Sequence, residues 1–146
     1  MEVIRIRYQG VIESLKTLKN GLAKLEKESQ SDLQTRDNEM YGLLCDGVIQ
    51  RFEYSLDTFW KFLKIYLESY LKTPIEGNSP RLVFRTALQS QLINLQELEI
   101  LLDSLGDRNL TSHTYNQVVA QEVRSHLLLY CMTMQTITAR FDHLLS

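Results

Sequence analysis

The sequence predicts an all-α protein, an antiparallel up-and-down four-helix bundle with one additional short helix. Three observations favour this fold. Apolar residues recur at spacings of three and four along most of the chain, which keeps them on one face of a helix. No segment alternates apolar and polar residues as a half-buried strand does, and residues typical of helix ends separate the periodic segments. The length of 146 residues predicts a single domain over residues 1–146.

The first predicted helix begins close to the first residue and carries one apolar stripe. The residues of this stripe are Ile4, Tyr8, Val11, Leu15, Leu18, Leu22 and Leu25. Gly21 is its weak point, because glycine is a poor helix former. A connector follows over residues 27–39, where the periodicity disappears and turn-forming residues accumulate.

The second predicted helix is longer and has a wider apolar surface. Its stripe consists of Cys45, Ile49, Phe52, Leu56, Phe59, Leu63, Tyr66 and Tyr70, widened by Trp60, Phe62 and Leu67. A helix that is apolar over so wide an arc needs two packing partners, or one partner and a second subunit. The helix is expected to end at residues 72–80, which contain Pro, Gly and Asn.

Two helices with recognisable caps follow. Ser79 before a proline predicts the start of a short helix over residues 79–93. Asn94 and Glu97 have the spacing of a capping box and predict the start of the next helix. Gly106 is expected to end that helix, because glycine is the usual residue just after a helix C-terminus.

The last predicted helix fills the C-terminal part of the chain. Its apolar stripe consists of Val119, Val123, Leu127, Tyr130, Met134, Ile137, Phe141 and Leu144. Thr114 and Gln117 also have capping-box spacing, so the helix is expected to begin at Thr114, with Tyr115 in its first turn.

Composition and charge exclude some classes of function and indicate where the protein is located. Sixteen Lys and Arg against eighteen Asp and Glu give a formal charge of -2. This balance excludes a protein that binds nucleic acid nonspecifically through a generally basic surface, although it does not exclude a local basic pocket. Cys45 and Cys131 lie in apolar stripes without ligand-like spacing, which indicates reduced core cysteines and a cytoplasmic protein. No apolar run reaches the ~18 residues of a membrane span, and the N-terminus lacks a signal-peptide core, so no membrane association is expected.

The joint between the last two helices carries the candidate functional residues. Within the stretch LGDRNLTSHTYNQVV these are Asp107, Arg108, Asn109, His113 and Tyr115. In an unbroken helix, positions 108 and 113 lie about 140° apart around the axis, so their side chains diverge. A kink or loop between Gly106 and Thr114 would instead bring the guanidinium and the imidazole together. The following helix start would add N–H groups that favour a phosphate.

These residue types suit RNA cleavage. Arginine presents a fork of donors that matches phosphate oxygens, and histidine exchanges a proton near neutral pH. RNA supplies its own nucleophile, the 2′-hydroxyl, so that no metal or cofactor is required. One histidine does not easily serve as both acid and base, but two copies facing each other across a dimer could. The alternative is a polar joint in which Arg108 pairs with Asp107 and His113 caps a carbonyl.

The segment RNLTSHTY resembles the signature of the HEPN (higher eukaryote and prokaryote nucleotide-binding) superfamily in its HepT toxin branch. That signature is an arginine, four residues, a histidine, one residue and a tyrosine. The successive blocks RFEYSLDTFWKFLKIYLE, SPRLVFRTALQSQLI and DRNLTSHTYNQ are similar to blocks of nucleotidyltransferase substrate-binding proteins. Together the blocks cover roughly residues 41–125, with matching order and spacing.

The resemblance implies a bundle that forms a homodimer with its motifs facing each other. It implies metal-independent RNA cleavage by Arg108 and His113, with Asp107 and Asn109 as orienting neighbours. It also implies a partner, a minimal nucleotidyltransferase that acts as antitoxin and transfers AMP onto the motif tyrosine, here Tyr115.

Two other functional interpretations remain open at the level of sequence. The chain could be a non-catalytic substrate-binding subunit of a two-protein nucleotidyltransferase, or a helical adaptor without nucleotide chemistry. Glu53 could reach the motif, although a charged position on a helix is usually just solvated. His126 and His143 lack partners at metal-ligand spacing and are interpreted as structural or surface residues.

Overall fold

A computed structural model describes residues 1–30, 38–113 and 117–145 of the chain; the described side chains are those of residues 1–30, 39–111 and 123–145. The described residues form helices and no strand. In chain order the elements are α1 (Glu2–Ser29), α2 (Asn38–Ile65), a π-helical turn η1 (Tyr66–Tyr70), α3 (Pro80–Gln89), α4 (Leu95–His113), α5 (Gln117–Ala139) and α6 (Asp142–Leu145). The all-α prediction is confirmed.

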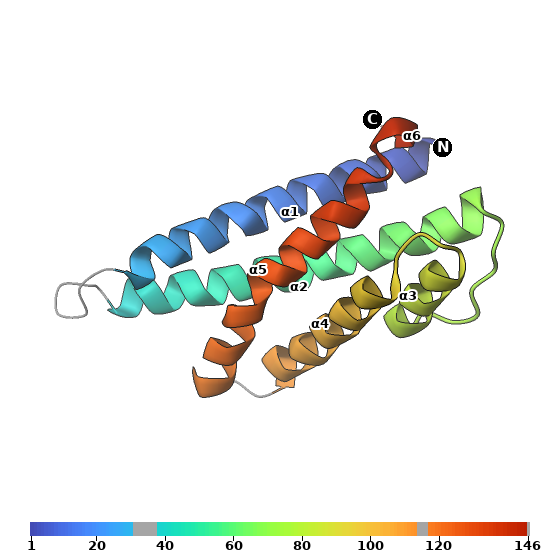
Figure 1. The fold of residues 1–146 in the computed structure, drawn as a ribbon. Coiled ribbons are helices and arrows are strands. Elements are labelled where there is room, and N and C mark those ends of the chain that lie inside the picture. Colours follow the sequence, from blue (N-terminus) through green and yellow to red (C-terminus); the bar gives the residue numbers. More distant parts are fainter. Residues whose placement is uncertain (31–37, 114–116, 146) are drawn as a thin grey trace.

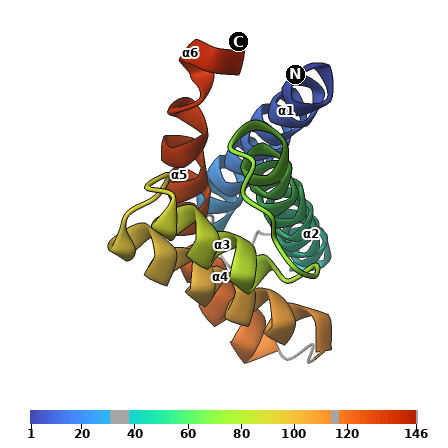
Figure 2. The same cartoon turned by 90° about the vertical axis from the view of Figure 1, so that its right-hand side faces the viewer.

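The four long helices run alternately in opposite directions, as predicted (Figure 1). Helices α1 and α2 lie side by side as an antiparallel pair, and α5 crosses this pair at an angle. Helix α4 packs against α5 and α3, and α3 also contacts α2 (Figure 2). The short helix α6 brings the C-terminal end of the chain close to the N-terminal end of α1.

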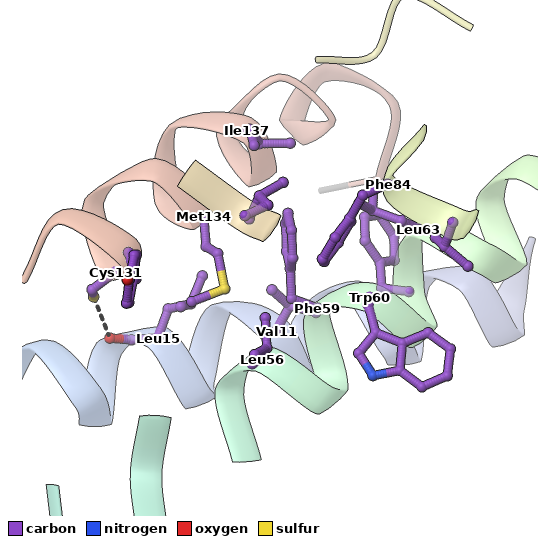
Figure 3. Close-up of a cluster of buried hydrophobic side chains, with 14 of the residues drawn as sticks. Val11, Leu15, Leu56, Phe59, Trp60, Leu63, Phe84, Cys131, Met134 and Ile137 are labelled. Atoms are coloured by element: carbon purple, nitrogen blue, oxygen red, sulfur yellow. Dashed lines mark hydrogen bonds between the residues drawn. The ribbon is translucent and has the colours of Figure 1, made fainter. Parts of the chain in front are cut away.

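The hydrophobic core lies along α2, whose wide apolar arc faces several helices at once. Phe59 and Leu63 point toward Phe84 of α3, while Met134 and Ile137 approach from α5 (Figure 3). The fully buried members of this core with the largest side chains include Tyr8, Phe52, Phe59, Phe62 and Phe84. The expectation that α2 needs more than one partner is confirmed, because it contacts α1, α3 and α5.

Cys131 is a reduced core residue, as the sequence predicts. Its thiol is buried, donates a hydrogen bond of 3.7 Å to the Leu15 carbonyl (Figure 3), and forms no disulfide. Burial raises the pKa of the Cys131 thiol to about 11. The reactive thiolate is therefore disfavoured at neutral pH. Cys45 differs, because it is only half-buried and accepts a hydrogen bond from Arg124.

The helix caps form as the sequence predicts. The Ser79 hydroxyl accepts a hydrogen bond from the Leu82 N–H. Asn94 and Glu97 complete a reciprocal capping box: the Glu97 N–H donates to Asn94 Oδ1 at 2.8 Å, and the Asn94 N–H donates to Glu97 Oε1 at 2.9 Å. Arg140 then binds Glu97 through two nitrogens, at 2.9 and 2.6 Å, which ties the start of α4 to the end of α5.

The predicted end of α4 at Gly106 is wrong, since the helix continues to His113. Gly106 does not adopt the positive φ of a helix-ending glycine, which among the described glycines is found at Gly77. The next two side chains, those of Asp107 and Arg108, bind neighbouring helices. These tertiary contacts favour the helical backbone beyond the glycine.

Other helix boundaries also differ from the expected ones. Helix α1 reaches Ser29 and α2 begins at Asn38, so both extend into the expected connector at residues 27–39. Helix α3 ends at Gln89 rather than at residue 93. The cause is Gln91, whose left-handed φ of 64° lets the following N–H close the helix end.

The last predicted helix is interrupted at residues 140–141. This break turns Phe141 into the core, where its ring meets Phe62 edge-on at 5.1 Å and Tyr66 at 4.7 Å. Asp142 then accepts a hydrogen bond of 2.9 Å from the Tyr8 hydroxyl of α1. The interruption therefore closes the bundle at this end. None of the helices within the described ranges combines the length and apolarity needed to cross a membrane.

Two glycines of α1 provide a matched test of packing. A methyl group at Gly21 would lie 3.2 Å from Val48 Cγ2 and 3.1 Å from Arg51 Nη1, whereas a methyl at Gly10 meets nothing within 4 Å. We expect Gly10→Ala to raise the free energy of unfolding by up to about 1 kcal/mol, the helix-propensity difference. Gly21→Ala should give little or none of this gain in denaturant unfolding, and equal gains would contradict the close contact of α1 with α2.

The Glu97–Arg140 pair predicts a pH-dependent part of the stability. Hydrogen bonding from Arg140 holds the pKa of the Glu97 carboxyl below its ordinary value of 4.5. The stabilisation is therefore fully present above about pH 4.5 and is lost as the pH falls through the lower, folded-state pKa. Glu97→Gln keeps the capping acceptor but removes the charge, and should cost about 1–2 kcal/mol at pH 7 in urea unfolding.

The exposed Glu99 on the same helix supplies the control for this prediction. Glu99→Gln should leave the stability within about 0.5 kcal/mol of the wild type. The difference between wild type and Glu97→Gln should shrink on acidification. A difference independent of pH down to about pH 2 would show that the charge of Glu97 does not contribute.

Candidate functional site

The candidate site is built on the C-terminal half of α4, where two adjacent charged side chains reach two different helices. Arg108 extends toward α2, where its Nη2 donates a hydrogen bond of 3.0 Å to Asp57 Oδ2. The side chains of Arg108 and Asp57 are 32% and 35% exposed, so the pair lies at the surface without being fully solvated. Trp60, one turn further along α2, donates from Nε1 to the other Asp57 oxygen at 3.4 Å. Asp57 thus holds the guanidinium in a defined position.

Asp107 extends in the other direction, toward α5. Its Oδ2 lies 3.0 Å from His126 Nδ1 and also accepts a short hydrogen bond from the Tyr130 hydroxyl. The ring of Tyr130 stacks on Phe52 with centroids 5.7 Å apart, which anchors this polar cluster to the core. The polar-joint alternative expected Arg108 to pair with Asp107, but the two side chains bind different helices.

Electrostatics keep the tyrosine of this cluster protonated. Burial, the hydrogen bond to Asp107 and the nearby charges of Asp107 and Asp103 all raise the pKa of Tyr130 far above its ordinary value of 10. Each effect disfavours the phenolate. Tyr130 therefore remains a hydrogen-bond donor at neutral pH and fixes one oxygen of the Asp107 carboxylate.

A groove of about 700 Å³ runs along the solvent side of this cluster, between α4 and α5. The residues that line it are Arg81, Ile100, Leu102, Asp103, Gly106, Asp107, Leu110, His126, Leu129 and Tyr130. Leu110 and Leu129 are both about half exposed, at 47% and 52%. The groove thus combines apolar walls with one arginine, one histidine and two carboxylates.

The structure describes the remaining predicted site residues only in part. Asn109 is exposed on α4, one residue after Arg108. His113 is the last residue of α4, and its side chain lies outside the described part of the chain, as does all of Tyr115. The expected kink between Gly106 and Thr114 does not occur before His113, because α4 is continuous. Positions 108 and 113 are therefore separated by about 140° around one helix.

Three members of the site are not predicted by the sequence: Asp57, His126 and Tyr130. Asp57 lies 51 positions before its partner Arg108, and His126 lies 19 positions after Asp107. The spacing of Tyr130 predicts a core residue and indicates no partner for its hydroxyl. The available signal is that Asp57 lies on the predicted helix with the wide apolar arc, within a block that resembles the family. Among residues with described side chains, no group of three or more His, Cys, Asp or Glu is arranged to hold a metal ion.

A second cationic contact lies nearer the start of α2. Arg124 of α5 donates from Nη1 to the Tyr41 hydroxyl at 3.1 Å and to Cys45 Sγ at 2.6 Å. Its guanidinium carbon lies 5.5 Å from the centre of the Tyr41 ring. The contact fixes the first turns of α2 to α5 and therefore supports the bundle on the side of the site.

Comparisons with known proteins show the family of this chain. Residues 13–143 match the model of the family described as nucleotidyltransferase substrate binding protein like. A crystal structure of a protein from Thermus thermophilus is similar with 32% identity and a TM-score of 0.63, covering 84% of this chain and 97% of that one. No protein with a curated description matches significantly.

A further similar structure is a chain from a crystal structure of a toxin–antitoxin with AMP-PNP. It shares 18% identity and a TM-score of 0.59, with 87% of this chain and 96% of that chain covered. At this identity the likeness concerns the fold alone. The family match, by contrast, spans most of the chain: the protein belongs to the nucleotidyltransferase substrate-binding-like family, and the resemblance noted from the sequence is confirmed.

The Tyr130 hydroxyl provides a test of the cluster around Asp107. Tyr130→Phe removes one donor from a largely buried carboxylate and should lower the free energy of unfolding by about 1–3 kcal/mol. Because the raised pKa of Tyr130 means that the unfolded state ionises first, this contribution is present below about pH 10 and is lost as the pH rises further. Urea unfolding at about pH 7 and about pH 10.5 measures both effects.

The control for this prediction is Tyr54→Phe, since Tyr54 is 62% exposed on α2. It should change the stability by less than about 0.5 kcal/mol. If Tyr130→Phe is equally silent at pH 7, the hydroxyl does not stabilise the Asp107 carboxylate.

Proposed function

We propose that the chain is the ribonuclease toxin of a toxin–antitoxin pair whose other member is a minimal nucleotidyltransferase. The family model supports the link to a nucleotidyltransferase. The fold shared with a chain of a toxin–antitoxin crystal structure is consistent with it. Within this proposal Arg108 and His113 cleave RNA without a metal ion, and Tyr115 accepts AMP.

The observation that carries the proposal is the anchored guanidinium of Arg108. The bond to Asp57 engages Nη2, whereas a guanidinium has five N–H donors. Donors therefore remain for phosphate oxygens, and they are held in a fixed orientation. Because the Asp57 carboxylate is itself bound by Trp60, the arginine is pre-positioned rather than mobile. Pre-positioned donors are the form in which charge stabilisation contributes most to catalysis.

The proposal requires a homodimer. Because α4 is continuous, positions 108 and 113 of one chain diverge around the helix. Arg108 of one protomer and His113 of its partner can meet at one phosphate if the two motifs face each other. Sedimentation equilibrium of the purified chain tests this point, and a strictly monomeric protein that still cleaves RNA would contradict the shared site.

The chemistry is a transesterification within the RNA. The 2′-hydroxyl loses its proton to the imidazole of His113, and the 2′-oxygen forms a bond to phosphorus. Arg108 stabilises the negative charge on the non-bridging oxygens as the bond to the 5′-oxygen breaks. The leaving oxygen takes a proton from water, and His113 returns its proton to the solvent. Asn109, exposed beside Arg108, can orient the sugar or the phosphate through its amide. The products carry a 2′,3′-cyclic phosphate and a 5′-hydroxyl.

Neutralisation would act on Tyr115. The tyrosine lies two residues after His113, so an AMP group on its hydroxyl would place bulk and negative charge beside the catalytic histidine. A phosphate so placed repels the RNA backbone by like-charge repulsion. The partner nucleotidyltransferase would supply AMP from ATP and release pyrophosphate.

The decisive measurement of the proposed function is cleavage of RNA by the purified chain in excess EDTA. We expect Arg108→Ala to lower the rate by about 10²–10³-fold and His113→Ala by about 10²–10⁴-fold. His143→Ala is the matched control, because His143 is exposed on α6 and should be silent. RNA that stays intact with the wild-type chain, together with normal growth of cells expressing it alone, would sink the proposed nuclease.

Modification is tested separately by intact-mass measurement after incubation with the neighbouring nucleotidyltransferase and ATP. The wild-type chain should gain one or more AMP units, and Tyr115→Phe should gain none. AMP addition that persists in Tyr115→Phe removes this tyrosine from the proposal. If the wild-type chain accepts AMP but does not cleave RNA even before modification, the result would instead favour the non-catalytic substrate-binding subunit that the family description suggests.

A further inference from the structure

Two cationic side chains line a pocket that lies apart from the candidate site, between α5 and the antiparallel pair of α1 and α2. This pocket, here called the cationic pocket, measures about 670 Å³. Its walls include Lys19, Leu25 and Glu26 of α1, Tyr41 of α2, and Arg124 and Leu128 of α5. None of its described lining residues also lines the groove between α4 and α5. The cationic pocket is therefore a second, separate hollow of the molecule.

Arg124 is a half-buried cation whose partners are neutral. Its Nη1 donates to the Tyr41 hydroxyl at 3.1 Å and to Cys45 Sγ at 2.6 Å. Among the side chains that the structure describes, no carboxylate lies within ion-pair distance of Arg124, whereas two other arginines, on α4 and after α5, each bind one. A cation that has lost part of its hydration without gaining a counter-charge is stabilised by an anion. Arg124 therefore favours an anionic ligand in this pocket.

The orientation of the Arg124 guanidinium is fixed before any ligand binds. Its central carbon lies 5.5 Å from the centre of the Tyr41 ring, in a cation–π contact that adds to the hydrogen bond with the hydroxyl of the same tyrosine. The two hydrogen bonds engage Nη1 alone, and a guanidinium has five N–H donors. Donors on Nε and Nη2 therefore remain for a ligand, and a donor that is already oriented loses less conformational entropy on binding.

Lys19 adds a second positive charge from α1. Burial raises the pKa of the Cys131 thiol, and the charge of Lys19 opposes this effect, so the ammonium group lies near α5. Within the described side chains Lys19 forms no ion pair. An arginine offers a planar fork of donors and a lysine offers a compact charge. Together they suit the several oxygens and the double negative charge of a phosphate group.

The rest of the pocket is largely apolar. Leu25 is buried at its base, while Leu128 of α5 is half exposed at its edge. Leu22 and Ala23 of α1 also line it. Pockets for small molecules measure about 300–1,000 Å³ and combine apolar walls with a few polar groups. A bare phosphate ion would leave these apolar walls without contacts, so the ligand should have an apolar body.

A carboxylate limits the charge that the pocket accepts. Glu26 lines the same pocket, and its Oε1 accepts a hydrogen bond of 3.2 Å from the neutral Gln30 side chain. With Lys19 and Arg124, the pocket thus has a net charge of about one positive unit. A nucleic-acid strand needs many cations along its backbone. A single phosphate placed between the two cations needs no more than these.

We propose that the cationic pocket binds a phosphate monoester with an apolar or aromatic body. The phosphate lies between Arg124 and Lys19, and the body lies on the leucines and Ala23. The site uses no residue of the motif between Asp107 and Tyr115. It is therefore independent of the nuclease proposed above, and either proposal can fail without the other.

Isothermal titration calorimetry of the purified chain with naphthyl phosphate tests the site. We expect saturable binding, because this probe has both the charged head and the apolar body. Naphthol, which lacks the phosphate, and inorganic phosphate, which lacks the body, should each bind about 10–100-fold more weakly. Hexyl phosphate tells whether the body is aliphatic or aromatic, and saturable binding of either ester supports the site.

Three variants change the affinity in opposite directions. Arg124→Gln should weaken the binding of naphthyl phosphate about 10–100-fold, because it removes charge-assisted hydrogen bonds. Lys19→Gln should weaken it about two- to fivefold, as expected for an exposed charge. Glu26→Gln should strengthen it about two- to fivefold, because it removes a like charge. A variant that is merely damaged does not bind more tightly, so this gain keeps the test valid if Arg124→Gln does not fold by circular dichroism.

The control is Lys24→Gln on the same helix, since Lys24 is exposed and does not line the pocket. It should change the affinity less than about twofold. A loss equal to that of Lys19→Gln would show that only the general charge of the chain attracts the probe, and would overturn the site.

The other outcomes also decide the inference. If neither ester binds saturably, the site does not exist. If naphthol binds as tightly as naphthyl phosphate, the cations do not contribute, and if inorganic phosphate does so, the pocket does not recognise a body. Either result overturns the proposal. Cleavage of RNA by the same preparation is measured separately and decides only the proposed nuclease.

Discussion

The position of the motif depends on two adjacent charged residues that reach in different directions from α4. Neighbouring residues of a helix point about 100° apart, so Arg108 meets Asp57 of α2 while Asp107 meets His126 and Tyr130 of α5. These contacts fix the helix on both sides just after Gly106, where its intrinsic propensity is lowest. The motif is therefore carried on a helix whose rotation is determined by two neighbours.

The polar contacts depend in turn on the core beneath them. Phe52 on α2 stacks on Tyr130, whose hydroxyl binds Asp107. An apolar contact between α2 and α5 thus sets the place of the carboxylate that receives the hydrogen bond. Trp60 links the core to Arg108 in the same way, because its ring is almost fully buried and its N–H binds Asp57, the partner of Arg108. The packing of the core therefore also determines the geometry of the site.

Membership of a family and the chemistry of a site rest on different evidence. The family follows from a match over most of the chain and from a 32% identical structure. Catalysis depends on a few side chains, and a shared fold alone does not fix it. The described part of the site supplies a held arginine, a carboxylate-bound histidine and a groove. Arginine and histidine are the side chains that RNA cleavage without a metal ion uses. These observations therefore favour the proposed nuclease over the non-catalytic substrate-binding subunit.

The predictability of the site differed between its members. Arg108, Asp107 and Asn109 could be selected because they form one short motif in the sequence, together with His113 and Tyr115. The partners Asp57 and His126 could not, since pairing across 51 and 19 positions leaves no trace in local spacing. The sequence predicts a structural or surface role for His126, and its contact with Asp107 exists only because α4 and α5 pack together.

The sequence by itself determined the long helices and their apolar faces, because the 3.6-residue period and the caps at Ser79 and Asn94 act over a few residues. Only the tertiary structure decided where α4 and the last helix end and which charges pair. A glycine stops a helix when nothing holds the next turn, and here two neighbouring helices hold it. Such contacts are made between segments distant in the chain, so local propensity does not contain them.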